Sequence, residues 1–103
     1  SALNDFNRAL QINPHHYDAL MQRGNLWVQK REYDKALKDF YTALIVKRES
    51  PQAYINLAGI YRNLGEFDKA LPLYQEALQL DPGNPEIQMN YEKLLKESNL
   101  KHK

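Results

Sequence analysis

EYDKAL at residues 32–37 returns almost unchanged as EFDKAL at residues 66–71. The two stretches lie 34 residues apart, and the same offset relates Trp27 to Tyr61. A period of this length is typical of repeats built from one helical hairpin, in which each unit covers the apolar face of its neighbour. The sequence therefore predicts a stack of repeats, and not a globule enclosing one buried active site.

The composition is that of an ordinary folded chain. Of its 103 residues, 43% are hydrophobic and 26% are charged, and the net charge is +1. This balance gives no electrostatic reason to expect nucleic acid or an acidic membrane surface as a partner. The absence of cysteine excludes disulfides and thiolate chemistry. No apolar run is long enough to insert into a membrane, and no basic-then-apolar signal segment opens the sequence, so we expect a cytoplasmic location.

Helical spacing of the apolar residues predicts six helices, and their ends follow from proline, glycine and capping residues. The expected ranges are roughly 1–13, 17–30, 33–48, 51–64, 67–80 and 85–99. Ser50 and Asn84 each precede a proline, an arrangement that caps the free amides of a helix start. Gly65 is expected to end the fourth helix in a left-handed conformation, and Arg31 occupies the equivalent position one repeat earlier.

Small side chains occupy positions where two helices are expected to approach closely. Gly24 and Ala58 lie in the middle of equivalent helices, and Ala36 and Ala70 lie in the helices that follow them. A larger side chain at any of these positions would overpack the contact between helices and destabilise the fold by about 1–3 kcal/mol.

These residues resemble the tetratricopeptide repeat (TPR) family closely, along nearly the whole chain. Residues 51–84 match the family's spacing at Tyr54, Leu57, Tyr61, Gly65, Phe67, Ala70, Tyr74, Ala77 and Pro82. Residues 17–50 match it at Leu20, Gly24, Trp27, Tyr33, Ala36, Phe40 and Ala43. The first of these two repeats departs from the family at Arg23, Arg31 and Arg48, where Leu, Gly and Pro are usual.

The resemblance implies an all-α fold. About six helices would form antiparallel pairs stacked as a right-handed TPR-type α-solenoid, and the first helix of each pair would line a concave groove. We expect a single solenoid over residues 1–103. Its parts would be the second half of a truncated repeat (1–16), two full repeats (17–50 and 51–84) and a terminal capping helix (85–103).

Both ends of the chain differ from a regular repeat. The sequence opens in mid-repeat, which suggests an excised or engineered fragment and predicts that Leu3, Phe6 and Leu10 face no partner helix. Glu92 stands where earlier repeats have a small residue, so that side of the last helix is expected to face water. The residues from Ser98 onward are expected to fray.

The resemblance also places one set of side chains in the groove. These candidate peptide-binding residues are Met21, Gln22, Asn25, Gln29, Ile55, Asn56, Arg62, Asn63, Met89 and Asn90. An amide side chain offers both a donor and an acceptor, and so matches a peptide backbone without choosing its sequence, while methionine adapts to varied apolar shapes. The alternative is that the amides only satisfy local polar groups. Arg62 is the one cation expected in mid-groove, where a solvated surface arginine is the simpler interpretation.

The favoured function is that of an adaptor or scaffold that binds a peptide segment of a partner protein in its concave groove. The main alternative is a self-assembling structural fragment or an engineered TPR scaffold, in which the exposed N-terminal half-repeat forms a homo-oligomer. A docking segment of a larger enzyme is a third interpretation. The sequence does not name the partner.

A co-chaperone that holds the free C-terminal carboxylate of a chaperone is a less favoured interpretation. Asn25 and Asn56 match the two asparagines of that carboxylate clamp in the family. Its cationic positions are instead occupied by Met21, Glu86 and Asn90. A carboxylate needs charge-assisted donors, and a glutamate would repel it.

Catalysis and metal binding find no support in the sequence. The four glycines are scattered, so no phosphate-binding loop is present. The histidines suggest no nucleophilic triad. His15 and His16 are adjacent in a predicted turn, but without nearby carboxylate or thiolate ligands they make a weak metal site. We therefore expect no enzyme activity, no cofactor and no metal.

Overall fold

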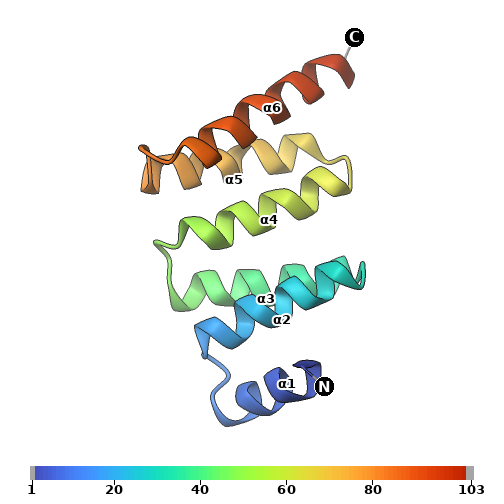
Figure 1. Cartoon of the computed structure of the whole chain (residues 1–103), viewed down its shortest axis with the longest axis vertical. Helices are drawn as coiled ribbons and strands as arrows, with labels where there is room; N and C mark the ends of the chain where they lie inside the picture. Colours follow the sequence, from blue (N-terminus) through green and yellow to red (C-terminus); the bar gives the residue numbers. More distant parts are fainter. Residues whose placement is uncertain (1, 102–103) are drawn as a thin grey trace. The chain divides into compact units, whose positions relative to one another are not determined.

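The computed structural model describes residues 2–101, which form six helices (Figure 1). They are α1 (Ala2–Ile12), α2 (Tyr17–Gln29), α3 (Tyr33–Val46), α4 (Pro51–Asn63), α5 (Phe67–Leu80) and α6 (Pro85–Lys101). The predicted all-α class and the six predicted helices are confirmed, and their ends differ from expectation by two residues at most.

The chain divides into two compact units, Ser1–Glu49 and Ser50–Lys103. In the first unit, α2 and α3 pair as a helical hairpin and α1 packs against α2. In the second unit, α4 and α5 pair in the same way and α6 packs against α5. Each unit thus contains one full helical hairpin and one additional helix.

The predicted capping residues of α4 and α6 act as expected. The hydroxyl of Ser50 accepts a hydrogen bond from the amide of Ala53 at 3.3 Å, and Pro51 begins the helix. The side-chain carbonyl of Asn84 accepts from the amide of Glu86 at 2.9 Å. Both side chains satisfy amides that have no partner within their own helix.

The turn inside each hairpin has the same backbone in both units. Arg31 has a φ of 60° and Gly65 a φ of 77°, so both residues are left-handed, as the sequence predicts. The amide of Glu32 donates to the carbonyl of Trp27 at 2.8 Å, and the equivalent bond in the second turn has the same length. Arginine therefore occupies a conformation that favours glycine by about 1 kcal/mol.

Small residues are buried where the paired helices meet. Ala36, Ala58 and Ala70 have no exposed surface. A Cβ atom added to Gly24 would lie 2.5 Å from the ring of Phe40, closer than any normal contact. The predicted close approach at these four positions is confirmed.

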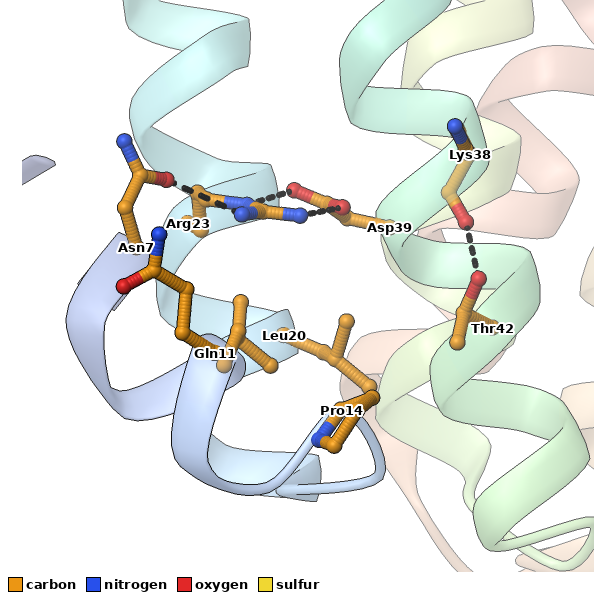
Figure 2. A pocket seen from close by; sticks show the side chains of 9 residues that line it. Asn7, Gln11, Pro14, Leu20, Arg23, Lys38, Asp39 and Thr42 are labelled. Carbon is orange, nitrogen blue, oxygen red and sulfur yellow. Dashed lines mark hydrogen bonds and ion pairs between the residues drawn. The ribbon is translucent and has the colours of Figure 1, made fainter.

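An ion pair is shielded inside the first unit, where the family usually has an apolar residue. Arg23 of α2 donates from Nε to Oδ2 of Asp39 at 2.8 Å and from Nη2 to Oδ1 at 2.7 Å (Figure 2). Its Nη1 donates to Oδ1 of Asn7 on α1 at 2.9 Å. Asp39 is only 3% exposed, and its hydrogen bonds raise the pKa of the Arg23 guanidinium. One side chain therefore joins all three helices of this unit.

The core of the second unit is apolar. Ala58 on α4, Ala70 and Tyr74 on α5, and Leu94 on α6 form one buried cluster. Burial of the phenol raises the pKa of Tyr74. The hydrophobic effect therefore contributes to holding these three helices together.

Two predictions about the ends of the chain are wrong. Leu10, expected to lack a partner, is buried at 7% exposure, because α1 packs against α2. Fraying was expected from Ser98, yet α6 continues to Lys101, while residues 102–103 lie outside the described part. Glu97, one turn before this end, forms an ion pair with Arg62 of α4. Glu92 is exposed, as predicted.

Candidate functional site

The face of α2 that carries the predicted amides is open to solvent. Gln22, Asn25 and Gln29 are all exposed. A helix turns by about 100° per residue, so these three side chains share one face. Met21 was expected beside them, but it is buried at 7% exposure and offers almost no surface to a ligand. In the first unit the candidate surface therefore consists of amides, without the expected apolar neighbour.

On α4 the predicted residues are less exposed. Asn63 is exposed, whereas Asn56 is half-buried and its side-chain carbonyl accepts a hydrogen bond from Nε2 of Gln52 at 2.8 Å. Ile55 is half-buried and packs against the apolar cluster of the second unit. Asn56 and Asn63 are seven residues apart, close to two full turns, and so lie on one face of the helix.

On α6 the predicted residues form a short exposed patch. Met89 is 62% exposed and Asn90 is half-buried. The expected apolar row along equivalent positions is therefore uneven, since Met21 is buried, Ile55 is half-buried and Met89 projects into solvent. Met89 is the one apolar member whose side chain is openly available to a ligand.

Arg62 is not the solvated surface cation expected from the sequence. Its Nε donates to Oε2 of Glu97 at 3.2 Å, and its Nη2 donates to Oε1 of the same carboxylate. The hydrogen bonds raise the pKa of the Arg62 guanidinium and lower the pKa of the Glu97 carboxyl. Glu97 thus takes two of the five N–H groups of this guanidinium and compensates its charge.

His16 has a structural role that sequence reasoning missed. Its Nδ1 accepts a hydrogen bond from the amide of Ala19 at 3.2 Å and so caps the start of α2. Among the residues that the structure describes, no group of three or more His, Cys, Asp or Glu side chains could hold a metal ion. None of the helices described in residues 2–101 is long and apolar enough to cross a membrane.

Asp39 is the other residue that sequence reasoning missed. Arg23 was noted as a departure from the family, but its partner was not identified. The signal was present, because the residues one repeat later are Leu57 and Leu73. Two apolar positions that both become charged, with opposite signs, indicate an ion pair between neighbouring helices.

Two family models match the chain. One tetratricopeptide repeat model matches residues 51–84, and a second tetratricopeptide repeat model matches residues 1–53. Repeats of this family generally mediate protein–protein interaction. A search of curated proteins found no match.

Solved structures with the same fold include a thermophilic TPR protein, TTC0263, of Thermus thermophilus. It is 29% identical to the present chain, with a TM-score of 0.84. The match covers 90% of the present chain and 47% of TTC0263, so the present chain spans about half the length of that protein. The first TPR of Spaghetti (RPAP3), bound to the HSP90 peptide SRMEEVD, is 18% identical with a TM-score of 0.86, over 94% of this chain and 77% of its own. The Arabidopsis OM64 TPR domain is 19% identical with a TM-score of 0.83. The match covers 91% of the present chain and 78% of the OM64 domain.

Proposed function

Because the chain belongs to the tetratricopeptide repeat family, we propose that it is an interaction module that binds a peptide segment of a partner protein. Each unit offers amide side chains of its own for these contacts, on α2 in the first unit and on α4 and α6 in the second. The observation that carries this proposal is the exposed set Gln22, Asn25 and Gln29 on one face of α2. The concave groove expected from the family resemblance remains a prediction.

The chemistry of these side chains suits an extended backbone. A peptide backbone presents alternating N–H donors and C=O acceptors, and a carboxamide satisfies one of each. Each neutral hydrogen bond contributes only about 0.5–1.5 kcal/mol, so several are needed for useful affinity. Met89, exposed on α6, supplies an adaptable apolar contact beside Asn90.

Recognition of a C-terminal carboxylate receives no support from the charges. The solved TPR of Spaghetti (RPAP3) holds an HSP90 peptide, which shows that this fold accommodates peptides. In the present chain Met21 is buried and Glu86 is exposed at positions where the family's carboxylate clamp has cations. Glu97 compensates the positive charge of Arg62, so this guanidinium adds no net charge for a terminal carboxylate. We therefore propose that the ligand is recognised through its backbone and not through a terminal carboxylate.

A peptide array tests this function. The intact chain is applied to an array of random unstructured peptides, and the best binder is then titrated against Asn56→Ala/Asn90→Ala. Losing hydrogen bonds at both positions should weaken binding about tenfold. Gln79→Ala, which removes an exposed amide from α5, is the matched control and should bind unchanged.

Circular dichroism separates loss of binding from loss of fold. The double variant should keep the helical spectrum of the parent chain, since neither side chain belongs to the buried cluster. Equal affinity of the double variant and the parent would remove the amides of α4 and α6 from the binding site.

A further inference from the structure

A pocket of about 460 Å³ opens to solvent in the first unit, between α1, α2 and α3 (Figure 2). Its volume lies within the ~300–1,000 Å³ of typical ligand sites. Leu10, Pro14 and Leu20 supply apolar lining, and Asn7 and Gln11 supply amides. The peptide-binding function proposed above does not use this pocket.

The pocket and the amide surface of α2 are separate. α2 contributes Leu20 and Arg23 to the pocket. At about 100° per residue, these positions lie on a different face of the helix from Gln22 and Gln29. A ligand in the pocket would therefore leave the proposed peptide-binding amides unoccupied.

The hydrogen bonds leave the pocket with unused donors. A guanidinium has five N–H groups, and Arg23 uses three of them on Asp39 and Asn7, so two remain without a partner among the described residues. The Arg23–Asp39 ion pair is neutral overall, so the remaining Arg23 donors act as hydrogen-bond donors and not as a net charge. Lys38 also lines the pocket and has an exposed side chain, which adds positive charge at its edge.

We propose that this pocket binds an acidic peptide segment. An Asp or Glu side chain of the ligand accepts hydrogen bonds from the remaining donors of Arg23 and pairs with Lys38. A neighbouring aliphatic side chain of the ligand packs on Pro14, the exposed apolar residue of the lining. A charged acceptor is favoured over a neutral one because charge-assisted hydrogen bonds are about twice as strong. The pocket is open, which suits a segment that continues beyond it on both sides.

NMR titration of the intact ¹⁵N-labelled chain tests the proposal. The probe is acetyl-Gly-Leu-Glu-Gly-amide, the matched control is acetyl-Gly-Leu-Gln-Gly-amide, and propionate represents a free carboxylate. The glutamate peptide should shift the signals of Asn7, Gln11 and Thr42, which line the pocket. The glutamine peptide should bind about tenfold more weakly, and propionate should bind more weakly still.

Three results would overturn the proposal. Equal affinity for the two peptides would show that the carboxylate is not recognised. Propionate binding as tightly as the peptide would indicate a small carboxylate as the ligand. Shifts centred on Gln22 and Gln29 would place the peptide on the amide surface. The array experiment concerns α4 and α6, so either proposal can fail while the other stands.

A double variant that gives the first unit the leucines of the second provides an independent test. Arg23→Leu/Asp39→Leu introduces the residues that the second repeat has at Leu57 and Leu73, and should fold while losing the preference for glutamate. A preference that survives in this variant would contradict the proposed role of Arg23.

Lys38→Gln tests the edge of the pocket without touching the ion pair. It should weaken the glutamate peptide several-fold, as expected for loss of a partly exposed charge pair. Lys93→Gln, at an exposed lysine of the second unit, should not weaken it. If the double leucine variant does not fold, the comparison of Lys38→Gln with Lys93→Gln tests the proposal by itself. Equal affinity of these two variants for the glutamate peptide would contradict the proposal.

Discussion

The two units have equivalent turns but differ in how their helices are held together. In the first, Arg23 and Asp39 form a shielded ion pair, whereas the second has Leu57 and Leu73 at the same positions. Leu57 has no exposed surface. Hairpins with equivalent turns are therefore compatible with either an ionic or an apolar contact at these positions.

Each unit also has one bidentate arginine–carboxylate pair, but in different surroundings. The side chain of Asp39 is 4% exposed and that of its partner Arg23 is 23% exposed. The side chains of Glu97 and Arg62 are 35% and 30% exposed. Because water screens the second pair, the two pairs should differ widely in what their loss costs.

Arg23→Leu should have the largest effect on stability. It leaves the Asp39 carboxylate buried without its charge partner, which we expect to lower the free energy of unfolding by about 3 kcal/mol. Adding Asp39→Leu should recover most of this loss, because the unit then carries the residues of the second one. Urea denaturation measures both changes, and a double variant as unstable as the single one would show that the ion pair itself is required.

Gly24→Ala should be the next most disruptive change. The added Cβ atom would lie 2.5 Å from the Phe40 ring, so the ring or the helix must move. We expect this movement to lower the free energy of unfolding by about 1–3 kcal/mol. The second unit has Ala58 at the equivalent position, with a tyrosine at position 74, so its helices accommodate the methyl group. Thermal unfolding checks this, and a melting temperature at or above that of the parent would show that Phe40 relocates freely.

Arg31→Gly should stabilise the protein. Its φ of 60° is a conformation that glycine adopts about 1 kcal/mol more easily. For a chain of this size the melting temperature should rise by about 4–8 °C. Gly65→Ala, the converse change in the second unit, should lower it. An unchanged or lower melting temperature for Arg31→Gly would mean that contacts of the arginine side chain offset the strain.

Glu97→Gln should lower the free energy of unfolding least, by less than about 1 kcal/mol at neutral pH. The reason is that the Arg62–Glu97 pair is partly exposed. Arg62 lowers the pKa of Glu97 in the folded chain below its ordinary value of 4.5. The stabilisation is therefore complete above that ordinary value and is lost as the pH falls through the lower folded-state pKa. Denaturation at neutral and acid pH should show the difference between variant and parent disappearing in acid. A difference that persists in acid would assign the effect to packing.

Much of the fold follows directly from local sequence features. Proline, the capping side chains of Ser50 and Asn84, and the repeated six-residue stretch determine where the helices begin and end. The pairing of Glu97 on α6 with Arg62 on α4 was not predictable in this way, because the two residues are 35 apart in sequence. A partner at that distance in sequence leaves no local pattern.

The candidate site was predicted less completely, because periodicity assigns a helix face but not the exposure of each side chain. Gln22, Asn25 and Gln29 are exposed, while their expected role in a groove remains a prediction. Periodicity failed for Met21, which is buried, because the exposure of a side chain depends on tertiary packing that periodicity does not reveal. The pocket in the first unit depends on three helices at once and had no signal except the charges at Arg23 and Asp39.

The central claim is that amide side chains on the first helix of each hairpin bind the partner. An NMR titration with the best peptide from the array, following the side-chain NH₂ signals of Gln and Asn, tests it most directly. We predict that the signals of Gln22 and Gln29 on α2 move while that of Gln79 on α5 stays fixed. Movement confined to Gln79 and its neighbours on α5 would contradict the claim.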